Sequence, residues 1–470
     1  MQNVVNLAPD TSFTNYQEIP VVDKPYDLIP DEVLLSQEHY ESEVRSYPRR
    51  IPIAIKTTRG VIVEDTKGQT YVDCLAGAGA LPLGYNHSEI NQVMITQLNE
   101  GVPYQTLDIT TPSKDAFIKA VMQFLPTNFA KTARIQFCGP SGADAVEASI
   151  KLAKLYTKRN TMASFHGAYH GMTNGSLALT GSLSAKERRT GLMSDVHFFP
   201  FPYSYRCSFG LGGEAGAKQS IRYIESVLCD DESGITKPAA IIVEPIQGEG
   251  GVIPASIEWL QELRRLTTEH GILLIFDEIQ CGVGRSGDNF AFEAAGIEPD
   301  ILVLSKAVGG GMPMSIILYH EKFDCWNAGE HTGTFRGNQL AMASGAKTLE
   351  IIKRDNLTEN AKLRGEQLRA GFTTIQAQFP EIGEVRGRGL MNAIEIVKPG
   401  QQNRLGQAIA DPELAAKIQR VALENGLIIE KGGRQGAVLR FLPPLIISET
   451  QIDFVIKTVT DAFTATVDNK

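Results

Sequence analysis

The sequence lacks long hydrophobic runs and strongly basic stretches. No segment approaches the roughly 20 apolar residues that a membrane-spanning helix needs. The first residues, MQNVVNLAPDTSF, have neither the basic start nor the apolar run of a signal peptide. The net charge is −9 and no Lys/Arg-rich run is present, which argues against nucleic acid or an anionic membrane as partner. We therefore expect a cytoplasmic protein.

Cysteine is scarce and dispersed. The six cysteines include no CxxC pair, whereas zinc sites and redox motifs usually bring two cysteines close together in the sequence. We expect reduced thiols in place of disulfides, and no metal site. The six are Cys74, Cys138, Cys207, Cys229, Cys281 and Cys325.

What the sequence does contain is an ordinary globular composition, with 470 residues of which 43% are hydrophobic and 21% charged. Residues 1–40 are polar and carry several prolines, and they predict an extended N-terminal arm. Residues 41–110, with a hairpin turned at Lys67-Gly68, predict the first part of a small domain. We expect a large domain over 111–345 and the rest of the small domain over 346–470. No internal repeat is present.

Short apolar strands alternate with helices through the middle of the chain. Helices are predicted over Gly142–Tyr156 and Ile257–Glu269. Near-continuous apolar strands separated by helices are typical of a mostly parallel sheet that is covered on both faces. The fold class is therefore α/β, with a smaller α+β domain formed by later helices and strands. The predicted strands of the large domain are Arg134–Phe137, Met162–Phe165, Ala239–Val243, Leu273–Phe276 and Ile301–Leu304.

Three of these strands deliver charged side chains at their ends. Glu244, Asp277 and Lys306 each follow an apolar strand closely, and ligands of an open α/β sheet bind beyond the carboxyl ends of its strands. A lysine there can be a solvated or ion-paired side chain. Alternatively it is a Schiff-base lysine for an aldehyde cofactor, with a carboxylate on the cofactor's ring nitrogen. The combination of two acids and a lysine favours pyridoxal phosphate.

A phosphate site is predicted where the strand Arg134–Phe137 leads into the next helix. Ser141, Gly142 and Ala143 stand at the helix start. The unpaired N–H groups and the dipole of a helix N-terminus favour an anion. The alternative is that Ser141 only caps the helix.

A glycine-rich segment offers a competing hypothesis. Gly282–Gly287, GVGRSG, fits the GxGxxG pattern of dinucleotide-binding proteins. In those proteins the pattern follows a strand at once and opens a helix, whereas here a polar stretch intervenes. We interpret it as a flexible loop near the cofactor, and keep a nicotinamide-dependent dehydrogenase as a distant alternative.

The motifs together resemble those of the class III pyridoxal-phosphate aminotransferases. They are SGADAVEASIKLA, GAYHG, VEPIQGEGG, IFDEIQCGVGRSG, SKAVGGGMPM, GTFRGN and LRFLPPL. The resemblance runs from about residue 45 to the end of the chain. It implies a fold-type-I large domain with a smaller domain, working as a homodimer or a dimer of dimers with sites at the subunit interface.

The resemblance also implies individual roles. Lys306 matches the Schiff-base lysine, and Asp277 matches the acid on the pyridine nitrogen. Gln280 matches the contact to the ring hydroxyl, with Glu244 in support. The further matches are Ser141, Gly142 and Ala143 for the phosphate, Tyr169 and His170 for the ring, and Thr334 for the phosphate of the other subunit.

Two further residues match a carboxylate switch. Arg440 resembles the arginine that binds the α-carboxylate of 2-oxoglutarate, and Glu249 resembles its partner. When the two pair, the site admits a terminal amine. When they separate, the guanidinium takes a carboxylate in bidentate fashion. A structural ion pair is the alternative.

Departures from the family pattern narrow the choice of the substrate that donates the amino group. Met172 stands where 4-aminobutyrate enzymes carry arginine, and Ala76–Ala80 lacks the aromatic of ornithine enzymes. The chain is instead similar to diaminobutyrate–2-oxoglutarate aminotransferases. That similarity implies transfer of the terminal amine of L-2,4-diaminobutyrate to 2-oxoglutarate, giving L-aspartate 4-semialdehyde and L-glutamate. Another class III ω-aminotransferase is the alternative. Arg45 and Tyr47 are candidates for holding the donor's carboxylate.

Overall fold

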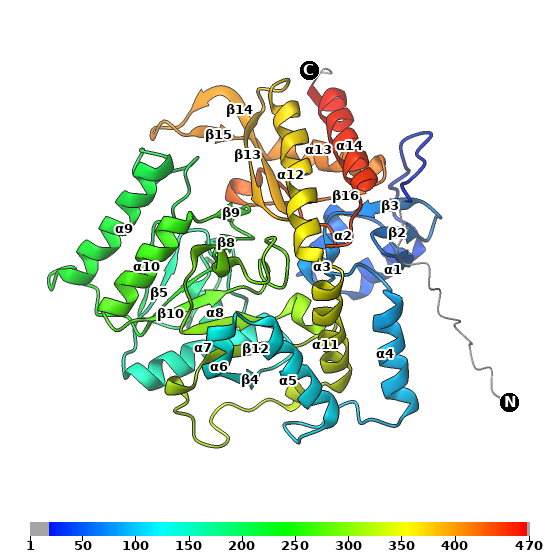
Figure 1. Ribbon diagram of the computed structural model, residues 1–470. Helices are drawn as coiled ribbons and strands as arrows, with labels where there is room; N and C mark the ends of the chain where they lie inside the picture. The colour runs from blue at the N-terminus through cyan, green and yellow to red at the C-terminus, as the bar shows by residue number, and fades with distance from the viewer. Residues whose placement is uncertain (1–17, 468–470) are drawn as a thin grey trace.

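The computed structural model describes residues 18–467, and it has a large α/β part and a smaller part that both ends of the chain build (Figure 1). Residues 1–17 of the expected arm lie outside the described residues. The remainder of the arm is not extended throughout, because helix α1 spans Glu32–Tyr40. The side chain of Asp31 accepts a hydrogen bond from the N–H of Leu34 and so caps this helix. The predicted domain boundaries stay a prediction.

A seven-stranded sheet forms the centre of the large part. Neighbouring strands are parallel, except that β12 runs antiparallel to both of its neighbours. The mostly parallel sheet is therefore confirmed, whereas the sequence did not predict β12 and the edge strand β6. The strands in spatial order are β4 (Ala133–Phe137), β12 (Ile316–His320), β11 (Ile301–Leu304), β10 (Leu273–Asp277), β7 (Ala240–Val243), β5 (Met162–Phe165) and β6 (Val196–Phe199).

Helices cover both faces of this sheet. They are α5 (Pro112–Phe124), α6 (Thr127–Thr132), α7 (Gly142–Thr157), α8 (Asn174–Leu179), α9 (Gly213–Cys229), α10 (Ile257–Glu269) and α11 (Gln339–Arg354). Alternate strand residues point to opposite faces. Leu274 and Leu302 accordingly share a core cluster with Trp259 of α10, whereas Ile275 and Val303 share another with α7. This arrangement confirms the expected α/β class.

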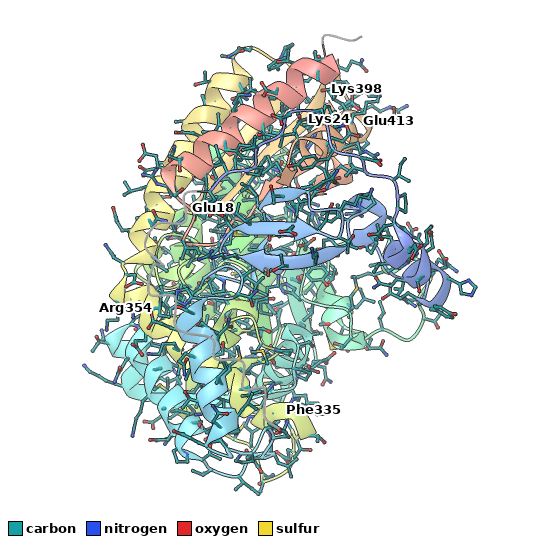
Figure 2. All side chains as sticks on the ribbon, turned by 90° about the vertical axis from the view of Figure 1, so that its right-hand side faces the viewer. Glu18, Lys24, Phe335, Arg354, Lys398 and Glu413 are labelled. Atoms are coloured by element: carbon teal, nitrogen blue, oxygen red, sulfur yellow. The ribbon has the colours of Figure 1, made fainter. Side chains whose placement is uncertain are left out.

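The smaller part joins segments from both ends of the chain. Its N-terminal elements are α2 (Tyr47–Arg50), β1 (Ile55–Arg59), β2 (Ile62–Asp65), β3 (Thr70–Asp73), α3 (Ala76–Gly79) and α4 (Ser88–Asn99). The predicted hairpin is β2–β3, which pairs antiparallel. The C-terminal strand β16 (Leu427–Ile428) then extends this sheet by pairing parallel with β3. Figure 2 shows β1–β3 toward the viewer, on the side that is at the right in Figure 1.

The C-terminal segments build a second sheet with helices against it. Strand β14 lies between β13 and β18, and β17 pairs with the far side of β18. The remaining elements are α12 (Leu357–Gln376), β13 (Ile382–Arg388), β14 (Met391–Gln402), β15 (Ala408–Ala410), α13 (Pro412–Glu424), β17 (Glu430–Gly432), β18 (Val438–Phe441) and α14 (Glu449–Val467). Within residues 18–467, no helix combines the length and the apolar character that crossing a membrane requires.

The glycine-rich segment Gly282–Gly287 is a buried turn, so the expectation of a flexible loop is wrong. Arg285 is buried and donates hydrogen bonds to the carbonyl oxygens of Leu390, at 3.1 Å, and Pro443. A Cβ at Gly284 would lie 2.9 Å from Leu445 Cδ1. The turn therefore packs against the C-terminal segments. A 3-10 turn and not an α-helix follows it at Ala291–Ala295, which removes the structural context that a dinucleotide fingerprint needs.

Glu278 holds this turn in place from the end of β10. It is buried, and its two carboxyl oxygens accept hydrogen bonds from the N–H groups of Ala291 and Phe292, at 2.7 and 2.8 Å. Burial raises the pKa of Glu278 to about 8, although the two hydrogen bonds oppose that rise. The folded protein therefore retains a proton that the unfolded chain releases near its ordinary pKa of 4.5.

We predict that Glu278 lowers stability as the pH rises. An acid whose folded-state pKa is raised stabilises the fold below its unfolded pKa, and this contribution is lost as the pH rises through about 8. Between about pH 5 and about pH 8.5, wild type should lose about 1 kcal/mol or more of unfolding free energy relative to Glu278→Gln, because each pKa unit corresponds to about 1.4 kcal/mol. Urea denaturation measures the difference. Glu298→Gln, at an exposed position, is the control, and equal pH slopes for wild type and Glu278→Gln would contradict the prediction.

Candidate active site

The carboxyl ends of three adjacent strands converge on one cavity. Strands β7, β10 and β11 are neighbours in the sheet, and they lead to Glu244, Asp277 and Lys306. All three residues line a cavity of about 440 Å³. Its other lining residues are Ser141, Gly142, Ala143, Tyr169, His170, Gly171, Met172, Thr173, Glu249, Ile279 and Gln280. Of the site residues predicted from the sequence, Arg440, Thr334 and the two candidates Arg45 and Tyr47 are not in this lining.

Lys306 is held in a strained conformation two residues after the end of β11. Its φ is 47°, in the left-handed region that residues other than glycine rarely adopt. The hydroxyl of Ser305 donates a 2.8 Å hydrogen bond to the carbonyl oxygen of Met314 and fixes the preceding residue. Burial lowers the pKa of Lys306; the charge of Arg440 also lowers it, and the carboxylate of Glu249 opposes the change. A lowered pKa makes the neutral, nucleophilic amine easier to form.

Asp277 is paired with a buried histidine. His170 Nδ1 lies 2.7 Å from Asp277 Oδ2, and both side chains are buried. The other carboxylate oxygen, Oδ1, accepts the N–H of Ile279 at 3.1 Å. These contacts fix the plane of the carboxylate at the cavity wall. His170 Nε2 is buried without a partner among residues 18–467.

Glu244 fixes the loop that carries the predicted ring-stacking aromatic. Its two oxygens accept the N–H groups of Tyr169 and Gly248, both at 2.9 Å. Burial raises the pKa of Glu244 to about 7, and the nearby carboxylate of Asp277 adds to that rise. The role of Glu244 is therefore to tie two loops together at the cavity wall.

The predicted phosphate end is the N-terminus of α7. The N–H of Ser141 donates to Asp144 Oδ2 at 3.0 Å, which is the reciprocal bond of a capping box, and the Ser141 hydroxyl donates to the same oxygen at 2.9 Å. A Cβ at Gly142 would lie 2.7 Å from Ile279 Cδ1, so a larger residue would displace the wall of the cavity. The unpaired N–H groups of a helix start favour an anion at this end.

Arg440 lies behind the cavity and binds two carboxylates. Its Nη1 and Nη2 donate to Glu249 Oε1 and Oε2, each at 2.9 Å, in the bidentate geometry that a guanidinium and a carboxylate form. Glu430 Oε2 lies 2.8 Å from Nη2. Burial alone would raise the pKa of Glu249, but the charge and hydrogen bonds of Arg440 outweigh burial and hold that pKa below its ordinary value. The predicted Glu249–Arg440 pair is present.

A second cavity of about 760 Å³ adjoins the first, and four residues, Tyr169, Met172, Glu249 and Lys306, line both. It extends past α2 to the segment Glu430–Gly436. Tyr47 lines it and donates its hydroxyl to Glu430 Oε1 at 3.1 Å.

Arg45, the other candidate for the donor's carboxylate, lies elsewhere. It is 3.5 Å from Glu38 and 3.8 Å from Glu41, and it lines neither of the two cavities. Its charge is therefore used within the N-terminal segment, and the candidacy of Arg45 is wrong for this arrangement of the chain.

Sequence reasoning missed Glu430. The signal in the sequence was an acid directly after the apolar residues Ile428 and Ile429, of the same kind as Asp277 at the end of β10.

Thr334 was predicted to act on another subunit, and the single chain leaves it exposed next to Phe335, which is 63% exposed. Phe335 is labelled in Figure 2 at the surface of the large part.

The donor set of the first cavity fits pyridoxal phosphate. An amine with a lowered pKa, a fixed carboxylate, an aromatic side chain and a helix N-terminus surround one space. In addition, Gln280 Nε2 donates to the carbonyl oxygen of Ala78 at 3.2 Å, and its buried Oε1 has no partner within the described chain. These groups match the aldehyde, ring nitrogen, ring face, phosphate and ring hydroxyl of the cofactor.

Comparison with known proteins agrees with this geometry. The family model "Aminotransferase class-III" matches residues 44–463. A diaminobutyrate–2-oxoglutarate aminotransferase of Rhizobium meliloti (strain 1021) is 51% identical over 459 residues, which cover 97% of this chain and 98% of that protein. A protein of the same name from Haemophilus influenzae is 50% identical over 433 residues, 90% of this chain and 95% of its own length.

A solved structure shows the same fold. It is an amine transaminase from an uncultivated Pseudomonas species, in its PLP-bound form, with a TM-score of 0.81 and 27% sequence identity. The match covers 91% of this chain and 98% of that chain. The fold is the fold-type-I architecture of the pyridoxal-phosphate transaminases, as expected from the motifs. The chain therefore belongs to the class III aminotransferases.

Proposed function

We propose that this protein is a diaminobutyrate–2-oxoglutarate aminotransferase. It transfers the terminal amino group of L-2,4-diaminobutyrate to 2-oxoglutarate and yields L-aspartate 4-semialdehyde and L-glutamate. The two relatives at 51% and 50% identity carry that name and align over nearly the whole chain. The observation that carries the proposal is the Glu249–Arg440 pair beside Lys306, because it lets one site accept two unlike substrates in turn.

Pyridoxal phosphate is the cofactor, and when bound it supplies an aldehyde and a ring that takes up the electrons of a bond broken at the substrate carbon. We assign its amine partner to Lys306, which also carries a proton between substrate atoms. Asp277, held by His170, would keep the ring nitrogen protonated. Tyr169 would pack against one face of the ring, and Gln280 would bind the ring hydroxyl. Ser141, Gly142 and Ala143 would hold the phosphate.

The Glu249–Arg440 pair takes a different form in each of the two half-reactions. With the pair closed, Glu249 neutralises the guanidinium, and the site accepts the end of diaminobutyrate that carries the terminal amine and no carboxylate. With the pair open, Arg440 binds the α-carboxylate of 2-oxoglutarate through two parallel hydrogen bonds. The ping-pong order of an aminotransferase requires both forms in each turnover.

A homodimer or a dimer of dimers completes the site in this proposal. Thr334 is exposed and, by family resemblance, reaches the phosphate of the other subunit. Two exposed apolar side chains, Tyr104 and Leu107, lie on a loop near it. A bridge between Gln105 and Asn338 pairs this loop with the residues that follow Thr334. Light scattering of the purified protein tests the assembly. The cytoplasmic location stays a prediction.

Donor preference is the direct test of the proposed function. The purified enzyme is offered diaminobutyrate, ornithine and 4-aminobutyrate separately, without acceptor, and the absorbance change of the bound cofactor is recorded for each. We expect the highest specificity for diaminobutyrate. A higher specificity for ornithine or 4-aminobutyrate would assign the protein to another ω-aminotransferase activity.

Replacing Lys306 should abolish turnover. We predict that Lys306→Ala lowers kcat by at least about 1000-fold, because the residue is both nucleophile and proton carrier, and that the variant loses the visible absorbance of the lysine-bound cofactor. Lys237→Ala, at an exposed lysine, is the control and should retain full activity. Ordinary transamination by Lys306→Ala would refute the role of this residue.

Replacing Arg440 should affect the two half-reactions unequally. Arg440→Lys keeps the charge but loses the bidentate fork. We predict a loss of about tenfold to a hundredfold in kcat/KM for the 2-oxoglutarate half-reaction, since hydrogen bonds to charged groups contribute about 1.5–3 kcal/mol. The diaminobutyrate half-reaction should change by less than about threefold, as it makes no such bond. Stopped-flow absorbance follows each half-reaction, and equal losses in both would contradict the switch.

A further inference from the structure

The second cavity is open to the unreactive end of a substrate that reacts at Lys306. It shares Lys306 with the cofactor cavity and extends from there to Tyr47, Arg50 and the segment Glu430–Gly436. A substrate whose terminal amine reacts beside Lys306 can therefore place its other end among these residues. Their charges decide which substrate fits.

The wall nearest Arg440 carries an excess of negative charge. Glu249 and Glu430 flank one guanidinium, so two carboxylates face a single cation. Glu430 is only 5% exposed. Its Oε1 accepts the hydroxyl of Tyr47, whereas Oε2 lies near Arg440 Nη2 but is not aligned with any hydrogen-bond donor within residues 18–467. This oxygen is already ion-paired with Arg440, and because no aligned hydrogen bond occupies it, it can accept one from a substrate ammonium group.

The lining of the same cavity also has a cationic part, here called the rim. Arg50, Lys431 and Arg434 line it. Arg50 Nη1 donates to the Lys431 carbonyl at 3.0 Å, Lys431 Nζ to the Gly436 carbonyl at 3.2 Å, and Arg434 Nη2 to the His166 carbonyl at 2.9 Å. All three acceptors are neutral carbonyls. Through the described part of the chain, none of the three cations forms an ion pair with a carboxylate, so the rim keeps its positive charge for a ligand.

We propose that this cavity recognises the zwitterionic head group of an amino acid donor, with Glu430 binding its α-ammonium and the rim of Arg50, Lys431 and Arg434 binding its α-carboxylate. The inference rests on the proposed function and names the residues that select the donor. Diaminobutyrate differs from 4-aminobutyrate only by the α-amino group, and from 1,3-diaminopropane only by the carboxylate. Glu430 selects diaminobutyrate over 4-aminobutyrate, and the rim selects it over 1,3-diaminopropane.

The same arrangement suits the acceptor. Glu430 stays beside Arg440 when Glu249 moves away, so it keeps the guanidinium oriented while one carboxylate of 2-oxoglutarate replaces that of Glu249. The second carboxylate of 2-oxoglutarate then faces the cationic rim. Glu430 does not contact this acceptor directly, and Glu430→Gln keeps a side-chain oxygen that can still accept from Arg440 Nη2. This variant should therefore spare the acceptor half-reaction.

The test combines variants with matched donors. Half-reactions of wild type and Glu430→Gln are measured with diaminobutyrate, 4-aminobutyrate and 2-oxoglutarate. We expect Glu430→Gln to weaken apparent binding of diaminobutyrate by about tenfold to a hundredfold, the range for a lost hydrogen bond to a charged group, with little change in the limiting rate. Binding of 4-aminobutyrate and 2-oxoglutarate should change by less than about threefold, because neither presents an ammonium to Glu430.

Two further variants complete the design. Glu430→Asp keeps the charge and should keep part of the preference for diaminobutyrate over 4-aminobutyrate, which also covers a failure of Glu430→Gln to fold. Arg50→Met should weaken diaminobutyrate more than 1,3-diaminopropane, which has no carboxylate for the rim.

The outcomes separate the inference from the proposed function. If wild type does not convert diaminobutyrate, the proposed function fails and the inference fails with it. If wild type converts diaminobutyrate but Glu430→Gln keeps the full preference over 4-aminobutyrate, or damages all three half-reactions equally, the inference alone is overturned. A Glu430→Asp variant without any preference for diaminobutyrate, when the acceptor half-reaction is intact, would also overturn it.

Discussion

The central constraint on this structure is the placement of a lysine amine against an apolar sheet. Strand β11 is almost completely buried, and Lys306 follows it in a strained conformation with φ of 47°. Desolvation disfavours the ammonium form, which lowers its pKa. The neighbouring strands bring Asp277 and Glu244 to the same edge, so the cost of burying the amine is offset by carboxylates that the sheet order places nearby. The chemistry of the cavity follows from this geometry.

A chain of charges links the amine to the substrate end of the site. It runs from Glu249 through Arg440 to Glu430 and the hydroxyl of Tyr47. Arg440 and Glu430 are buried, where a charge is stable only if it is paired and hydrogen-bonded. Displacing Glu249 from this chain frees one face of the guanidinium while Glu430 still neutralises the other. The protein can thus present a closed pair to a diamine and an open cation to an oxoacid without leaving Arg440 unpaired.

Much of the fold was predictable because the strands of the large part are continuous apolar runs. The sequence predicts the strands β11 (Ile301–Leu304) and β10 (Leu273–Asp277) from their apolar residues. These strands in turn place the acids and the lysine at one edge of the sheet. The antiparallel strand β12 was missed because its direction depends on its neighbours in space. The turn Gly282–Gly287 was misjudged for a similar reason, since its burial comes from Leu390 and Pro443, more than a hundred residues later.

The substrate end of the site was harder to predict than the cofactor end. Glu430 acquires its role from contacts with Arg440 and Tyr47, the latter 383 residues away. Arg45 and Tyr47 are equally plausible in sequence, and only the packing of α2 separates them. Conversely, the pairing of Glu249 with Arg440 was accessible through family motifs, although no local pattern connects the two.

The identity of the lysine that carries the cofactor tests the central claim most directly. The purified enzyme is treated with borohydride to fix the cofactor to its amine, digested, and analysed by peptide mass spectrometry. The account predicts that the cofactor's mass is found on the peptide that contains Lys306. Attachment to another lysine, such as Lys431 in the adjoining cavity, with Lys306 unmodified, would contradict it.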